Sequence, residues 1–524
     1  MKTKQIFVAL TILFTLLFAS NGHAQAIVAA SSGNWSSTVP NAPWPGGIVP
    51  GANDYVDVES GINITVDVTN AICAIIYSGD EDAPDYPSTG TVTMTPGSTL
   101  TITETNTEGY GAQTLGVLDA TATNCTVIYE GNAFWAKRCN YYNLVFTGYG
   151  DFYNGPQNGY PAVGQTSWMT IYGNLSVIGG ANIPADKIGV YVGVYLQMGS
   201  NITVIGDLTI GASNAWDCSS YNLSVAGNTY CTGILWDKDA TYGSNYFGGN
   251  VTILPSNMYL TNTSDTLVGG TGPNILPGGG PVYGGSLYVL DVTQWAFGAN
   301  LTNNGIIGFG TNYGTLFFNG TGTIAGSNAF TIPTMVINGT YEIADTITLT
   351  TNAPTINGTV VFDLANTNQI VLNAGTNWFW YTTNGTLQVI NTGAAPVAGN
   401  SYTLFVTNGM AGGGYGGGFS NISLPSLSPG LFWVNELLTN GSIVVGGNGG
   451  GGSPTLTLSR TGSTLNLTWS TSTYPGYQVY ALTNSAGVIT NLSHSWKATG
   501  SNASPATFTI NPNSPPTFFR LRNP

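Results

Sequence analysis

One short phrase recurs within residues 318–391 and decides the fold of this chain. It joins asparagine, glycine and threonine, and its copies are Phe318-Asn319-Gly320-Thr321, Ile337-Asn338-Gly339-Thr340, Ile356-Asn357-Gly358-Thr359 and Asn384-Gly385-Thr386. The first two intervals are 19 residues and the third is 27. Apolar and polar residues mostly alternate after each phrase, so each unit is predicted to contain a strand with one buried face.

A fixed period near 20 residues with one or two strands in each unit predicts a β-solenoid, in which each turn of chain stacks on the one before. Equivalent side chains then repeat at the strand spacing of ~4.8 Å. Asn319, Asn338 and Asn357 are therefore predicted to form a ladder at a corner, where glycine would supply a positive φ. The alternative is a meander in which Asn-Gly marks hairpin turns, and it does not explain the repeated spacing.

Residues 1–24 are predicted to be a secretory signal peptide. Lys2 and Lys4 precede an apolar run from Ile6 to Phe18, and small residues follow up to Ala24. This run is too short for a membrane span. We therefore expect an exported chain, either secreted or held at the cell surface, with no transmembrane segment after cleavage.

The composition favours an extended β architecture and excludes polyanionic partners. Only 6% of the 524 residues are charged, 72 are glycine, and the formal net charge is −14. No lysine or arginine occurs between Lys238 and Arg460. A nucleic acid or an anionic membrane would find too few cations to neutralise its phosphates, so neither is expected as a partner.

Residues 25–68 carry a second pattern, with tryptophans in turn-rich segments ahead of the first strands. The segments are Ser32-Gly33-Asn34-Trp35, Trp44-Pro45-Gly46-Gly47-Ile48-Val49-Pro50-Gly51, and the strand-like runs at 54–58 and 62–68. They resemble the opening of many secreted bacterial β-helix proteins. The resemblance implies an N-terminal cap and the first strands of a solenoid. Large aromatic side chains would cover the first coil, which has no neighbour below it.

Residues 69–445 are predicted to form the solenoid itself, with strand-like segments whose spacing drifts between about 20 and 31 residues as loops are inserted. Its last part resembles the segment that closes secreted bacterial proteins with autotransporter-associated β-strand repeats. The residues that carry this resemblance are 385–389, 398–405, 418–419, 424–425, 430–433 and 441–445. It implies the end of a β-helix.

The glycine-rich stretch 446–453 is predicted to be a flexible linker. Residues 454–524 then contain about six short apolar runs and are similar to fibronectin-III/immunoglobulin-like modules, with Trp469 as the core aromatic residue. The predicted fold is thus all-β, a parallel β-helix followed by a small C-terminal β-sandwich.

Five cysteines leave two interpretations open. An exported chain permits disulfides, and the nearest pairs in sequence are Cys125/Cys139 and Cys218/Cys231, which leaves Cys73 over. The alternative is that all five are small buried hydrophobic side chains.

Two features are candidate binding sites. Asp80, Asp82 and Asp85 form an acidic group that would hold calcium or, alternatively, a solvated loop; no other cofactor is expected. Trp378 and Trp380 share one face of a strand and would either stack on sugar rings or pack against the neighbouring chain.

Candidates for catalysis are few. A Ser-His-Asp triad would need His494, and a lyase base would have to come from Lys137, Arg138, Lys187 or Lys238. Lys137-Arg138 beside Glu130 is the nearest to a cluster, and its alternative interpretation is a solvated corner. We therefore name no catalytic residue.

Three functions remain open on this basis. The first is a non-catalytic structural or adhesion protein at the cell surface, built on a solenoid. The second is a carbohydrate-binding or carbohydrate-active β-helix protein, with a polysaccharide as partner. The third is the subunit of an extracellular filament, which would self-associate or bind other surface proteins.

Overall fold

A computed structural model shows two units, each of which is described by itself. The first comprises residues 1–362, 368–388 and 407–422, and the second comprises residues 363–367, 389–406 and 423–524. The structure describes residues 26–77, 90–103, 117–137, 139–154, 168–179, 194–212, 214–218, 221–236, 244–255, 259–260, 282–283, 286–289, 294–309, 314–328, 330–373, 379–381, 384–408, 415–447, 456–469, 477–483, 497–499, 504–509, 511, 513–514 and 517–522. The predicted signal peptide and most of the predicted linker lie outside these residues.

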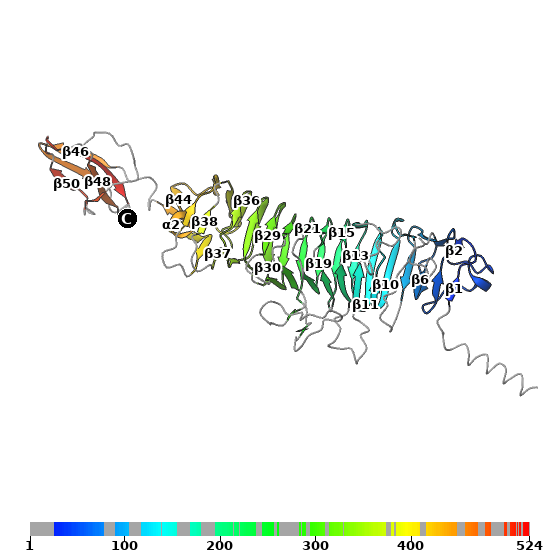
Figure 1. Ribbon diagram of the computed structural model, residues 1–524. Helices are drawn as coiled ribbons and strands as arrows, with labels where there is room; N and C mark the ends of the chain where they lie inside the picture. The colour runs from blue at the N-terminus through cyan, green and yellow to red at the C-terminus, as the bar shows by residue number, and fades with distance from the viewer. Residues whose placement is uncertain are drawn as a thin grey trace, which may run out of the picture. The chain divides into compact units, whose positions relative to one another are not determined.

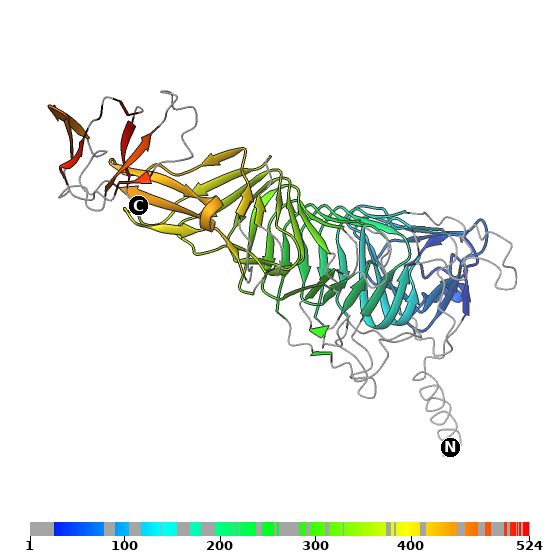
Figure 2. The same cartoon turned by 60° about the vertical axis from the view of Figure 1, so that its left-hand side comes forward.

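The first unit is a parallel β-helix (Figures 1 and 2). Among the described residues, most of its coils contain three short strands. The interval between two copies of the repeated phrase forms one coil, made of β30 (Thr321–Gly326), β31 (Phe330–Ile332) and β32 (Thr334–Ile337). The predicted solenoid is confirmed, but one or two strands were expected where the structure has three. Strands of three or four residues are too short to show a full alternating pattern in the sequence.

Equivalent strands of successive coils pair in parallel and build sheets along the unit. The first sheet contains β12 (Trp168–Ile171), β15 (Asn201–Val204), β18 (Leu223–Val225), β21 (Ser244–Phe247), β26 (Gln294–Phe297), β29 (Thr315–Phe318), β32 and β35 (Thr355–Ile356). The second contains β5 (Ala71–Cys73), β8 (Thr99–Ile102), β10 (Thr126–Trp135), β11 (Asn143–Asn154), β13 (Leu175–Val177), β16 (Leu208–Ile210), β19 (Thr229–Cys231), β22 (Val251–Ile253), β27 (Leu301–Asn303), β30, β33 (Thr340–Ile343) and β36 (Thr359–Asp363).

The third side of the coils is formed by β14 (Val194–Met198), β17 (Ala215–Asp217), β20 (Ile234–Trp236), β25 (Ser286–Val289) and β28 (Ile306–Phe309), and further along by β31, β34 (Ile347–Leu349) and β37 (Ile370–Leu372). The first coils use β1 (Ala26–Val28), β3 (Tyr55–Asp57) and β6 (Ile75–Tyr77), and β2 (Gly33–Asn34), β4 (Asn63–Val66), β7 (Thr91–Met94) and β9 (Val117–Asp119). Short additional pairs are β23 (Tyr259–Leu260) with β24 (Val282–Tyr283), and β38 (Phe379–Tyr381) with β42 (Tyr415–Gly417). The chain passes between the units within four of its strands, which are β36, β39 (Thr386–Ile390), β41 (Phe405–Thr407) and β43 (Asn421–Ser423).

The repeated phrase stacks as predicted. Asn338 Nδ2 donates a hydrogen bond to Asn319 Oδ1 at 2.8 Å, and Asn357 Nδ2 donates to Asn338 Oδ1 at 2.9 Å. The fourth copy continues the stack, because the amide of Thr386 donates to the carbonyl of Gly358 at 2.8 Å. The strands around the phrase pair in parallel, so the hairpin interpretation of Asn-Gly is wrong.

The glycines of the repeated phrase were predicted to supply a positive φ, and the structure shows a different role for them. Gly320, Gly339 and Gly358 do not have a positive φ. A Cβ on Gly339 would instead overlap the carbonyl oxygen of Gly320, and a Cβ on Gly358 would overlap that of Gly339. Glycine is required here because the corners of successive coils approach backbone to backbone.

A second ladder runs beside the second sheet and tolerates very uneven spacing. The amide of Asp207 donates to Asn174 Oδ1 at 2.9 Å, although 33 residues separate them. Asn228 and Asn250 continue the column, and Asn300 joins it at 3.4 Å across an interval of 50 residues. The coils therefore stay in register even where an insertion makes the interval longer than the spacing of about 20 to 31 residues that the sequence predicts.

A column of aromatic side chains fills the core beside the repeated phrase. Phe297 and Phe318 stack with ring centroids 5.5 Å apart, and Phe318 meets Tyr341 edge-on at 5.1 Å. The phenol of Tyr341 donates to the carbonyl oxygen of Phe297 at 2.8 Å and lies 3.1 Å from that of Ala299. Burial raises the pKa of Tyr341 to about 12, so the hydroxyl remains a donor at neutral pH.

Tyr341→Phe is expected to lower the free energy of unfolding by about 1–3 kcal/mol, because the buried carbonyl of Phe297 and the part-buried carbonyl of Ala299 lose their hydroxyl partner. Urea unfolding of the wild type and the variant measures this difference. Tyr402→Phe is the matched control, since the hydroxyl of Tyr402 is only part-buried and its 3.3 Å bond to Asn400 Oδ1 is long. An effect of Tyr341→Phe no larger than that of the control would contradict the assigned role.

Two tryptophans form the centre of the predicted N-terminal cap. Trp35 and Trp44 are buried and meet edge-on with ring centroids 5.2 Å apart. Trp44 Nε1 donates a hydrogen bond to the carbonyl oxygen of Trp35 at 2.6 Å. The amide of Trp35 donates to the carbonyl oxygen of Thr65 at 2.7 Å. The short 3-10 helix η1 (Pro45–Gly47) follows Trp44. Both rings are therefore buried among the first strands, and the role of residues 25–68 as an N-terminal cap stays a prediction.

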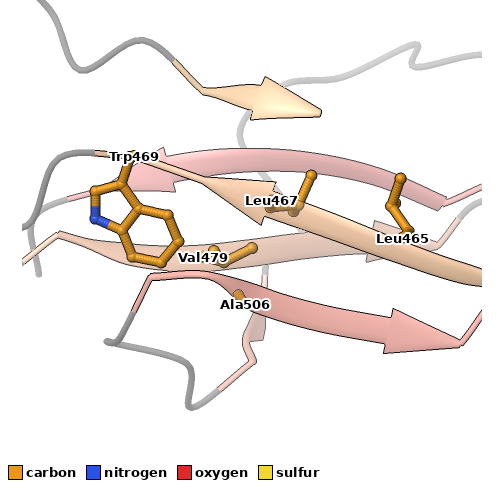
Figure 3. Packing of buried hydrophobic residues seen from close by; sticks show 5 residues of the cluster. All are labelled: Leu465, Leu467, Trp469, Val479 and Ala506. Atoms are coloured by element: carbon orange, nitrogen blue, oxygen red, sulfur yellow. The ribbon is translucent and has the colours of Figure 1, made fainter. Parts of the chain in front are cut away.

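The described residues of the second unit form three antiparallel sheets. The first is β40 (Ser401–Thr403), β45 (Ser442–Gly447) and β44 (Leu431–Glu436), with α2 (Leu437–Asn440) between the last two in sequence. The other two form the predicted β-sandwich, with β46 (Thr457–Thr461), β47 (Thr464–Thr468) and β50 (Ala506–Thr509) in one sheet and β49 (Lys497–Ala498), β48 (Gln478–Thr483) and β51 (Thr517–Arg522) in the other. Trp469 lies in their common core with Leu465, Leu467, Val479 and Ala506 (Figure 3).

One carboxylate organises a turn of the second unit. Asp363 accepts hydrogen bonds from the amides of Ala365 and Thr392, both at 3.0 Å, and from the Thr392 hydroxyl. Two effects on the pKa of Asp363 oppose each other: loss of surrounding solvent acts to raise it, and the hydrogen bonds to the carboxylate act to lower it. The hydrogen bonds have the larger combined effect, so the pKa of Asp363 lies below its ordinary value.

Asp363 is therefore expected to make stability fall in acid. Its folded-state pKa is below its unfolded-state value of about 3.9, so its contribution is complete above that value and is lost as the pH falls through the folded-state pKa. The difference in melting temperature between wild type and Asp363→Asn should be present at pH 7 and should close near pH 2. A difference that is independent of pH would rule out the ionised carboxylate as its source.

Candidate functional site

The two predicted binding sites are only partly covered by the structure. Asp80, Asp82, Asp85 and Trp378 lie outside the described residues. Trp380 lies on β38, whose backbone pairs in parallel with β42, and its side chain is not described. The calcium and sugar-stacking hypotheses at these positions remain predictions.

The cysteines require a correction. All five are buried thiols, and neither predicted pair, Cys125/Cys139 or Cys218/Cys231, forms a disulfide. Cys125 Sγ donates to the carbonyl of Ala120 at 3.1 Å, and Cys231 Sγ donates to that of Gly233 at 3.3 Å. Burial raises the pKa of Cys125 to about 11 and that of Cys231 to about 12. The side chains fill the coils as small hydrophobic groups, which is the alternative interpretation.

Lys137 is not at a solvated corner. It is 3% exposed, its amide donates to Tyr129 Oη at 3.1 Å, and its carbonyl accepts a bond from Tyr141 Oη at 2.5 Å. Burial lowers the pKa of Lys137. Glu130, in contrast, is exposed. A lysine held inside the coil is shielded from a polymeric substrate, so this geometry does not support a lyase base at Lys137.

The other catalytic candidates, Arg138, Lys187, Lys238 and His494, lie outside the described residues. Among the residues that the structure does describe, no three His, Cys, Asp or Glu side chains form a group that would hold a metal ion.

The first sheet of the first unit has a regular outer surface. Along each strand, one set of side chains is buried and the alternate set faces outward. We call the outward set the uncharged face, together with three residues just beyond the strand ends. Its members are Trp168, Thr170, Tyr172, Asn201, Thr203, Ile205, Asn222, Ser224, Ser244, Tyr246, Gln294, Ala296, Thr315, Phe317, Thr334, Val336 and Thr355.

No member of the uncharged face is acidic or basic, although the chain carries 24 acidic residues. The second sheet differs, since Glu130 lies on β10, Asp207 directly precedes β16, and Glu342 lies on β33. The absence of charge is thus a property of this side of the coil and not of the whole surface.

Large side chains are exposed at one end of the uncharged face. Trp168 is 55% exposed, Tyr172 46%, Ile205 49% and Tyr246 44%. Trp168 and Tyr172 are four residues apart, roughly 13 Å along an extended chain, and Tyr246 lies three strands from β12, roughly 14 Å across the sheet. The rings of Trp168, Tyr172 and Tyr246 therefore border an area of roughly 13 Å by 14 Å, which is wide enough for more than one sugar ring.

Polar groups between the rings are held in fixed orientations. Asn201 Oδ1 accepts the amide of Asn222 at 2.8 Å, and Asn222 Oδ1 accepts the amide of Ser244 at 2.8 Å. Each side-chain oxygen is engaged in this way, which fixes the direction of the NH₂ group beside it. The hydroxyl-bearing residues Thr203 and Ser224 pair in register in the neighbouring column.

The sequence alone did not identify this surface. Trp168 and Tyr246 are far apart in the chain, and only the register of the coils brings their strands into one sheet. The available signal was a large aromatic residue on the polar side of an alternating strand, as in Trp168-Met169-Thr170-Ile171.

Comparison with known proteins found little similarity. No family model and no curated protein matches the chain. Among solved structures, the crystal structure of the Haemophilus influenzae Hap adhesin matches with 11% identity and a TM-score of 0.22, and the match covers 76% of this chain and 56% of that one. A likeness of this extent carries no information on function.

No helix within the described part of the chain has the length and apolar character needed to cross a membrane.

Proposed function

We propose that this protein is exported and works without catalysis as an adhesion or structural protein at the cell surface. The observation that carries the proposal is the uncharged face, because eight parallel strands present it as a repeating surface with exposed rings at one end. Weak contacts repeated along such a surface add up to firm attachment. The predicted signal peptide, the resemblance to secreted β-helix proteins and the fibronectin-III/immunoglobulin-like character predicted for the C-terminal sandwich support the same role.

Beads coated with the protein, from residue 25 onward, test the proposal. They are expected to adhere to cells or to their extracellular matrix, while beads coated with a heat-unfolded sample are not. Incubation with polysaccharides should release no reducing ends or unsaturated products. Beads that fail to adhere, or a protein that degrades a polysaccharide, would overturn the proposal.

Self-association into a filament is a second proposed route to the same structural role. Light scattering of the protein over a range of concentrations tests it, and a monomer at all concentrations would rule this route out.

A further inference from the structure

We propose that the uncharged face binds a neutral polysaccharide, whose sugar rings stack on Trp168, Tyr172 and Tyr246. This inference rests on the proposed function and names its ligand class and its binding residues. It places the site on the first sheet, to which β38, the strand of Trp380, does not belong.

The charge of the surface restricts the ligand. A polyanion or polycation would lose its hydration and counterions on this face and find no opposite charge among the outward side chains. A neutral ligand has no such cost. The face is also free of the negative charge that gives the chain its net value of −14, so an uncharged polymer is the ligand that it fits.

The exposed side chains supply the contact area. Sugar rings have apolar faces formed by C–H groups, and the flat rings of tryptophan and tyrosine match them in size. Trp168, Tyr172 and Tyr246 are each more than two-fifths exposed. Tyr246 lies on β21, which pairs with β18 and β26, and Trp168 lies on β12, which pairs with β15. The sheet therefore fixes the backbone at both residues before a ligand arrives.

The polar side chains between the rings provide specificity. The oriented NH₂ groups of Asn201 and Asn222 are donors toward sugar hydroxyls, and Thr203 and Ser224 add hydroxyls that both donate and accept. These groups repeat from coil to coil at the strand spacing of ~4.8 Å. A protein partner would have to pair each of them individually, whereas a polysaccharide presents its own hydroxyls in a repeating row.

Affinity electrophoresis of the protein through gels that contain soluble neutral glucans, mannans or xylans tests the proposal, with polygalacturonate as the charged comparison. At least one neutral polymer is expected to retard the protein, and retardation should persist in 1 M NaCl because no ion pair contributes. Tyr246→Ala and Trp168→Ala should each weaken binding about tenfold, the loss of one stacking contact.

Tyr230→Ala is the matched control. Tyr230 is 42% exposed against 44% for Tyr246, but it lies on β19 of the second sheet. Its removal is expected to leave binding unchanged, and melting curves establish that all variants are folded. Three outcomes overturn the inference: no neutral polymer binds, Tyr230→Ala weakens binding as much as Tyr246→Ala does, or Tyr246→Ala changes the oligomeric state instead of binding. If bead adhesion persists in any of these cases, the proposed function stands and only its ligand is wrong.

Discussion

Gly339→Ala is expected to destabilise the first unit by about 3 kcal/mol or more, and to prevent export or soluble expression if the unit is only marginally stable. The added methyl group would overlap the carbonyl oxygen of Gly320 in the coil below. That oxygen belongs to backbone and cannot rotate away as a side chain would. The two coils must therefore separate, which also strains the amide ladder from Asn319 through Asn338 to Asn357.

Gly418→Ala is the matched control for this substitution. A Cβ at Gly418 meets nothing within 4 Å, and its backbone does not have a positive φ. Alanine there should change stability by no more than about 0.5 kcal/mol, or raise it slightly by restricting the unfolded chain. Urea unfolding compares the two variants. Equal effects at Gly339 and Gly418 would show that the glycines are not required for close approach of the coils.

Trp44→Ala is expected to cost about 3–5 kcal/mol, because it leaves a large cavity at the end of the stack and removes the bond from Trp44 Nε1 to the carbonyl of Trp35. The first coils should then become accessible to protease before the rest of the unit unfolds. Ile48→Ala is the control, since Ile48 is close in sequence but 59% exposed. Limited proteolysis with N-terminal sequencing and urea unfolding measure both effects. If the loss is below about 1 kcal/mol, Trp44 does not act as a cap.

Much of the first unit could be predicted because its repeats are close in sequence. The copies at Asn319, Asn338 and Asn357 have equal spacing, so their stacking follows from the period alone. The burial of Trp35 and Trp44 was also predictable, since large aromatic residues ahead of the first strands are expected to cover apolar surface. The role of the glycines was not, because a sequence does not show how closely two backbones approach.

The candidate site could not be predicted for a related reason. A residue such as Tyr246 becomes part of a surface only when its strand lies beside others that are far away in the chain. Asn250 and Asn300 show how large that separation is, since they are neighbours in one ladder across 50 residues. The burial of Lys137 was missed for a different reason. Tyr129 and Tyr141, which form hydrogen bonds with its backbone, are close in sequence, but two adjacent basic residues suggest a solvated corner.

The central claim is that successive segments of the chain stack as coils in register, whatever the length of chain between them. Distances between spin labels test it most directly, with one label at Trp168→Cys and the second in turn at Gln294→Cys, Thr315→Cys and Thr334→Cys. The cysteines of the chain are buried and should not react. Because these sites lie four, five and six strands along one sheet from β12, the backbone separations should be roughly 19, 24 and 29 Å, a constant step of ~4.8 Å. Distances that do not increase by a constant step would contradict the stacked coil.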